Sequence, residues 1–159
     1  MPAMLTTYSI MLTLHSILRW VILIAGLLAV ARACSGWIGG RIWGADDNRA
    51  GIWFVAALDL QLLVGLVLHV ILSPLTQIAM SDPAAAMQNS ALRFWFVEHP
   101  FGMVVALVLA HVGRVRIRKA ATDISRHKAA TIFFTLALIV IVLASPWPGM
   151  ANARPLLPW

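Results

Sequence analysis

Five histidines are the residues best suited to chemistry in this chain, because the imidazole ring is a common metal ligand. They are His15, His69, His99, His111 and His127. The first three fall toward one end of the chain's apolar segments, and the other two fall toward the opposite end. Two imidazoles at comparable depth on adjacent helices suit axial ligation of a haem iron, with one ring nitrogen on each side of the metal. Ligation of a haem by two of the first three histidines is therefore one interpretation of the spacing.

The same histidines also have a purely structural interpretation. Histidine is tolerated near a membrane interface, and His99 is placed to cap a helix beside Glu98. Small residues nearby favour the cofactor, since Gly65 lies four residues before His69 and Gly102 lies three residues after His99. Such residues would leave room for a macrocycle. Both interpretations stay open on the spacing alone.

Two other residues, His127 and Cys34, are not expected to bind a metal or a cofactor. His127 lies between Arg126 and Lys128, which predicts a solvated ring rather than a ligand of a second haem. Cys34 is the single cysteine, so the chain has no internal disulfide and no zinc site built from its own cysteines.

Two charged residues lie deeper in the apolar segments. Arg19 is near the middle of the first segment, and Asp59 is seven residues into the second. An unpaired charge at the centre of a membrane helix costs roughly 2.5–3.5 kcal/mol, so each side chain is expected to have a partner. The two helices would be antiparallel neighbours, which predicts an Arg19–Asp59 ion pair that Gln61 is able to join. Because Arg19 shares a helix face with His15, four residues earlier, it is also a candidate for binding a haem propionate.

Membrane-spanning helices would position these side chains. Of the 159 residues, 61% are hydrophobic and 11% are charged, whereas a soluble domain carries about 25% charged residues. The mean hydropathy is +0.87. Four apolar segments, about 8–33, 52–72, 97–117 and 124–145, are long enough to span a bilayer and lack the alternation of a barrel. We expect an all-α four-helix transmembrane bundle that forms a single membrane domain over residues 1–159.

The connection between the second and third segments has a helix signal of its own. Ser81-Asp82-Pro83 offers an N-cap followed by proline at the first helical position. The run after it, 84–88, favours a helix. This predicts a short interfacial helix between the second and third spans.

Basic residues are distributed unequally between the two sides of the predicted bundle. One side has only Arg93 and Arg154. The positive-inside rule therefore predicts both termini on the periplasmic side of a bacterial inner membrane. The net charge of +6 is then explained by cytoplasmic loops, and no nucleic-acid partner is expected. Nine basic residues lie on the other side: Arg32, Arg41, Arg49, Arg114, Arg116, Arg118, Lys119, Arg126 and Lys128.

Several short strings occur in a familiar order. They are Leu14-His15-Ser16 with Arg19, Gln61-Leu62-Leu63 with Gly65, Ser73-Pro74, Arg93-Phe94, Val97-Glu98-His99-Pro100, Gly113-Arg114, His127-Lys128 and Ser145-Pro146-Trp147-Pro148. This order resembles a family of small bacterial four-helix membrane proteins labelled cytochrome-b-like. The resemblance implies a b-type haem protein with His15 and His99 as the matching ligand positions. This chain departs from the family at Asp59, where a histidine often occurs, and His69 is the residue that would replace such a ligand.

These observations favour an integral membrane subunit that transfers electrons through a haem b in a bioenergetic complex. The alternative is a haem-free structural or accessory subunit that packs on a larger respiratory or photosynthetic assembly. In both cases the expected partners are the lipid bilayer and other membrane subunits, and no independent catalytic activity is expected. A pump or transporter is disfavoured because no chain of acidic residues crosses the predicted bundle.

Overall fold

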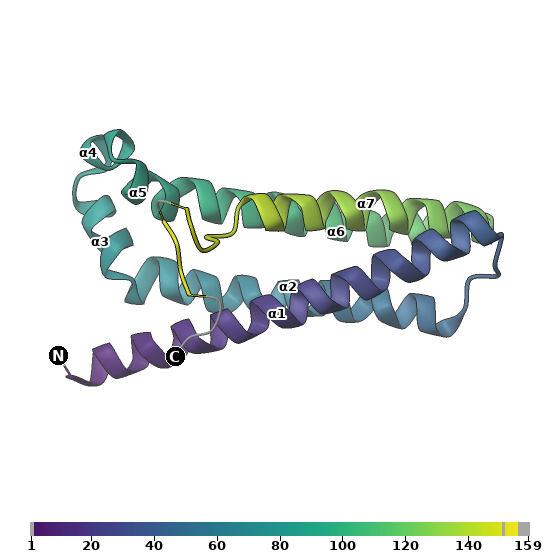
Figure 1. The fold of residues 1–159 in the computed structure, drawn as a ribbon, viewed down its shortest axis with the longest axis horizontal. Helices are drawn as coiled ribbons and strands as arrows, with labels where there is room; N and C mark the ends of the chain where they lie inside the picture. The colour runs from purple at the N-terminus through teal and green to yellow at the C-terminus, as the bar shows by residue number, and fades with distance from the viewer. Residues whose placement is uncertain (1, 151, 156–159) are drawn as a thin grey trace.

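Four long antiparallel helices form the molecule in this computed structural model, which describes residues 2–150 and 152–155 (Figure 1). They are α1 (Pro2–Gly39), α2 (Ala45–Val67), α6 (His99–Lys119) and α7 (Asp123–Leu143). A π-helical segment, η1 (Leu68–Leu72), continues α2, and a second one, η2 (Phe94–Glu98), leads into α6. The prediction of an all-α four-helix bundle is confirmed, and the described residues contain no strand.

Each of the four long helical stretches is long and apolar enough to cross a membrane. They cover Met4–Gly39, Ala45–Leu72, Ser90–Lys119 and Asp123–Leu143. The first and third begin and end beyond the apolar segments expected from the sequence, and the second begins earlier but ends at Leu72 as expected. The last one ends two residues before the expected Ser145, since Pro146 restricts the backbone ahead of it. The chain is a multi-pass integral membrane protein.

The two ends of the bundle differ in what connects the helices (Figure 1). One end, here called the basic end, has the short connections 40–44 and 120–122. The other end, here called the histidine end, has the long connection from Ser73 to the start of η2, and the C-terminal tail from Ala144 crosses it toward α1 (Figure 1). His15, His69 and His99 lie at this end.

Three short helices fill the long connection: α3 (Pro74–Ser81), α4 (Pro83–Gln88) and α5 (Ser90–Arg93). The helix predicted at Asp82-Pro83 is α4, where the Asp82 carboxylate accepts a hydrogen bond from the N–H of Ala85 at 3.0 Å. Ser73-Pro74 is the same kind of signal and begins α3, with the Ser73 hydroxyl accepting from the Thr76 N–H. The placement of these helices at a membrane interface stays a prediction.

Small residues let the long helices approach closely. On α6, Ala106, Ala110 and Gly113 are buried, and they face α7, where Ala130 and Ala137 are buried as well. Helices in a membrane associate mainly through such close packing, because lipid gives no hydrophobic drive between them. The main core extends from the basic end through the Phe54–Phe134 ring pair, whose centroids are 5.4 Å apart. The histidine end has only a small separate apolar cluster around Val64, Leu68 and Leu72.

Candidate functional site

A cavity of about 120 Å³ lies at the histidine end, between α1, α2 with η1, and the start of α6. Its walls are mostly apolar. All three histidines of this end line it, although they come from three different helices. The polar side chains in its wall are His15, His69, His99, Tyr8, Gln61, Ser73, Thr76 and Arg154. A smaller cavity of about 50 Å³ adjoins it beside His15 and His99 and is also lined by Arg19.

His99 is held in place by a hydrogen bond at the first turn of α6. Its Nδ1–H donates to the backbone carbonyl of Ala144 at 2.7 Å. A neutral ring that donates through Nδ1 has an unprotonated Nε2, whose lone pair is available to a metal. The rings of Phe94 and Trp95 pack against His99, with centroids at 5.8 and 5.7 Å. The neighbouring Glu98 pairs with Arg93, with Nε of Arg93 2.6 Å from Oε1 of Glu98.

His15 faces His99 from α1. The two ring centroids are 6.2 Å apart and the ring planes meet at 69°. Among the described residues nothing hydrogen-bonds the His15 ring, and its Nδ1 is buried. Gly65 of α2 lies directly against it, because a Cβ at that position would lie 3.3 Å from Cε1 of the ring. His15 is therefore held by packing and keeps both nitrogens free.

His69 occupies the π-helical segment η1 and lines the same cavity. Its ring stacks on Phe96 of η2, with centroids 6.3 Å apart and planes at 17°. The structure thus brings His15, His69 and His99 around one cavity, and the His15–His99 pair is in ring contact. That any two of these histidines bind a haem iron stays a prediction.

The predicted Arg19–Asp59 ion pair is wrong. Arg19 is buried, and its guanidinium donates to the carbonyl of Pro155 at 3.3 Å and lies 5.6 Å from the ring of Trp147. Asp59 instead pairs with His111 of α6 at 2.8 Å. Depth along the helices was judged correctly, but Asp59 points to the α6 side of α2, away from α1. Arg19 remains beside His15 in the wall of the smaller cavity.

Arg154 of the tail was missed by the sequence reasoning. It lines both cavities, lies 5.0 Å above the ring of Trp95, and approaches the Tyr8 hydroxyl at 3.5 Å. The tail has no helical periodicity, so no spacing argument places it over the histidine end. The prolines that end α7 were the one available signal, because they force the chain to turn there.

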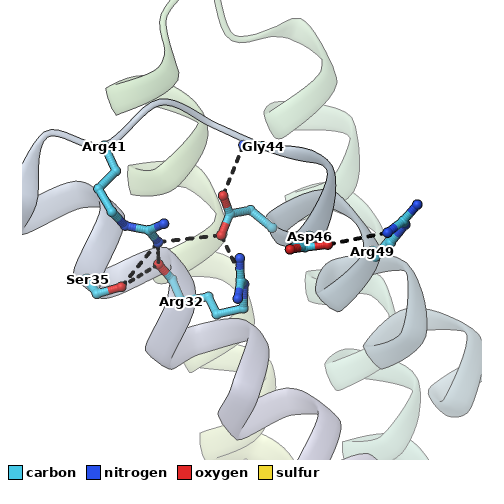
Figure 2. A network of polar contacts seen from close by, with 7 residues as sticks. Arg32, Ser35, Arg41, Gly44, Asp46 and Arg49 are labelled. Carbon is cyan, nitrogen blue, oxygen red and sulfur yellow. Dashed lines mark hydrogen bonds and ion pairs between the residues drawn. The ribbon is translucent and has the colours of Figure 1, made fainter.

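Polar groups at the basic end line neither of these two cavities. The buried carboxylate of Asp47 accepts from Arg32 at 3.1 Å and from the backbone N–H of Gly44 at 3.0 Å, and it lies 3.5 Å from Arg41 (Figure 2). This network ties the end of α1 to the start of α2. It leaves the Asp47 carboxylate fully used in holding the connection.

The prediction that His127 is solvated is wrong. Its ring is fully buried between α7 and α1, with the Trp43 ring at a centroid distance of 4.8 Å. Gly36 makes the space, because a Cβ there would overlap the imidazole. Neither ring nitrogen has a hydrogen-bond partner among the described residues.

Within the part of the chain that the structure describes, no three His, Cys, Asp or Glu side chains converge closely enough to hold a metal ion. A pair of axial imidazoles on a haem iron needs only two such ligands. Comparison with family models, with characterised proteins and with solved structures finds no match.

Proposed function

We propose that this chain is an integral membrane b-type haem protein, with His15 and His99 as the axial ligands. The observation that carries the proposal is the separation of their rings, 6.2 Å between centroids, on two helices that meet at one cavity. Two imidazoles on opposite sides of one metal, each with its nitrogen at about 2.0 Å, have ring centres roughly 6 Å apart. The separation of the two ring centres is therefore of the size that ligation of one metal requires.

The surroundings of both rings support this assignment. The carbonyl of Ala144 fixes the tautomer of His99, which is the usual way for a protein to orient a ligating imidazole. His15 has no competing hydrogen bond in the described chain. The likeness to cytochrome-b-like proteins points to the same two positions. Position 59 lines neither cavity, so the absence of a histidine there removes no ligand from this site.

The room beside the histidines is smaller than a macrocycle needs. The main cavity measures about 120 Å³, against about 300–1,000 Å³ for typical ligand pockets. A macrocycle would therefore need side chains of the cavity wall to move aside. Arg19 and Arg154 are the cations placed to meet acidic propionates.

When bound, a haem would supply single-electron transfer. The chain's own residues hold the ligand rings at a set distance and surround them with apolar groups. We further propose that it serves as a subunit of a bioenergetic membrane complex, contacting other membrane subunits and having no catalysis of its own. The haem-free structural subunit is the alternative that the first experiment decides.

The purified full-length protein, produced with a supply of haem, is expected to show the reduced α-band of a b-type haem. His15→Ala and His99→Ala should each abolish the low-spin spectrum. His111→Gln removes an imidazole outside both cavities and should leave it intact. Absence of the band from the unmodified protein would overturn haem binding and favour the structural subunit. Loss of the spectrum with His69→Ala but not with His99→Ala would reassign the second ligand.

We also propose that the basic end faces the cytoplasm and that both termini are periplasmic, in a bacterial inner membrane. The nine basic residues on that side support this orientation. Reporter fusions after Lys119 should report a cytoplasmic location, and fusions after Pro155 an external one. The reverse pattern would overturn the orientation without bearing on the haem.

A further inference from the structure

An acid–base pair lies on the outer surface of the bundle between α2 and α6. Nε2 of His111 and Oδ1 of Asp59 are 2.8 Å apart, and the side chains are 51% and 47% exposed. Both residues belong to membrane-spanning stretches. Asp59 lies seven residues into the apolar segment that begins at Ile52, which is about 10 Å at the helical rise of 1.5 Å per residue. The pair therefore faces hydrocarbon if the molecule is alone in the bilayer.

This pair has hydrogen-bonding capacity left over. His111 uses Nε2 and Asp59 uses Oδ1, while Nδ1 of the ring and Oδ2 of the carboxylate have no hydrogen bond within the described residues. Polar atoms without partners are costly in the bilayer core, and ionisable side chains there almost always face protein or a water-filled cavity. Neither residue lines a cavity described above. Something polar must cover this surface.

The surrounding surface has the pattern of a helix–helix seam. Exposed residues of α2 and η1 recur at alternating steps of four and three around Asp59, and exposed residues of α6 do the same around His111. Such 3–4 spacing keeps one stripe facing a partner helix, and a single polar residue within it fixes register. The two stripes are Ile52, Ala56, Asp59, Leu63, Leu66 and Val70, and Val104, Val108, His111 and Val115.

We propose that a second copy of this chain covers the α2–α6 face in a two-fold dimer whose axis runs along the membrane normal. Asp59 and His111 lie at one depth because they are hydrogen-bonded to each other. A rotation about the membrane normal keeps that depth, and it brings the acid of each copy against the base of the other. With both ring nitrogens protonated, His111 donates Nε2–H to Oδ1 of its own Asp59 and Nδ1–H to Oδ2 of Asp59 in the second copy, which uses both remaining atoms. A helix of another protein would have to carry its own acid and base at the same depth in the membrane, whereas a second copy carries both already.

The dimer is tested in membranes by cysteine cross-linking of the full chain after Cys34→Ser. Leu63→Cys lies on the α2 stripe and should cross-link to a product with the mass of two copies. Ile17→Cys is the matched control: it is exposed on α1, and α1 is level with α2 here because Gln61 bonds the carbonyl of His15. Equal cross-linking of the two variants, or none from Leu63→Cys, would overturn the proposal.

Charge variants provide a second measurement, the dissociation constant of the dimer in detergent. Asp59→Asn should raise it about tenfold, as expected for losing two interhelical hydrogen bonds in a membrane protein. The exchanged variant Asp59→His with His111→Asp keeps an acid and a base at the same depth and should recover most of the affinity. An unchanged constant in Asp59→Asn would contradict the assigned contact. These tests do not depend on haem binding.

Discussion

The basic end and the histidine end both bury polar side chains, but the surroundings of these side chains differ. At the basic end, Asp47 has three partners, and the ring of His127 fills the gap that Gly36 leaves. At the histidine end, His15 and His99 border open volume and keep ring nitrogens free. The buried His127 also lacks hydrogen bonds within the described residues, but it lines neither of the two cavities. A histidine in a membrane bundle is thus a candidate ligand where packing leaves room next to it.

Gly36→Ala should lower the stability of the basic end more than any other variant proposed here. A methyl group at position 36 overlaps the His127 ring, and overpacking a tight core costs about 1–3 kcal/mol, so we expect a loss near the upper value. Thermal unfolding in detergent, followed by circular dichroism, measures the change. Gly39→Ala on the same helix is the control, because its Cβ would meet nothing closer than 3.9 Å. Equal effects of the two variants would show that the basic end is not tightly packed.

Asp47→Ala should destabilise the protein by about 2 kcal/mol, because it removes charge-assisted hydrogen bonds and a helix cap. The loss is moderate because Arg32 and Arg41 are a third or more exposed and regain water. Asp46→Ala removes only an exposed pair with Arg49 and should change stability by less than about 0.5 kcal/mol. Chemical denaturation of both variants gives the comparison. A larger effect at position 46 would contradict the role given to Asp47.

His127→Leu sharpens the distinction between a buried histidine and a ligand. The substitution replaces a ring without described hydrogen bonds by an apolar side chain of similar size, so stability should rise by about 1 kcal/mol. The haem spectrum should not change. A drop in stability together with a lost spectrum would instead assign His127 to a binding site.

Gly65→Ala should change stability by less than about 1 kcal/mol in either direction. The helix gains from alanine, while the new Cβ comes 3.3 Å from the His15 ring, which has cavity space to move into. The expected consequence is a shifted ligand, visible as a changed haem spectrum at nearly constant melting temperature. A large destabilisation would show that the histidine end is as tightly packed as the basic end.

The position of a residue along its helix was predictable from the sequence, but the direction in which its side chain points around the helix axis was not. Hydropathy predicted the helices, proline with a capping side chain predicted the start of α4, and counting residues placed His15, His69 and His99 at the same end of the bundle. Rotation of a helix about its axis depends on its neighbours, so Asp59 was assigned to Arg19 although it faces His111. Charged neighbours of His127 predicted exposure, whereas Gly36, far away in the sequence, decides its burial. Arg154 lies in an irregular tail for which no periodicity exists.

The π-helical segments on either side of the long connection have an evolutionary consequence. Such a turn has wider hydrogen bonding than an α-helical turn, and it commonly arises as a one-residue insertion in a helix. Losing one codon within Phe94–Glu98 would restore a regular helix and rotate the preceding short helices by about 100° relative to α6. The buried faces of the four long helices would keep their register. Deletion of one residue can therefore change which side chains of the short helices cover the cavity, while the four long helices keep their packing.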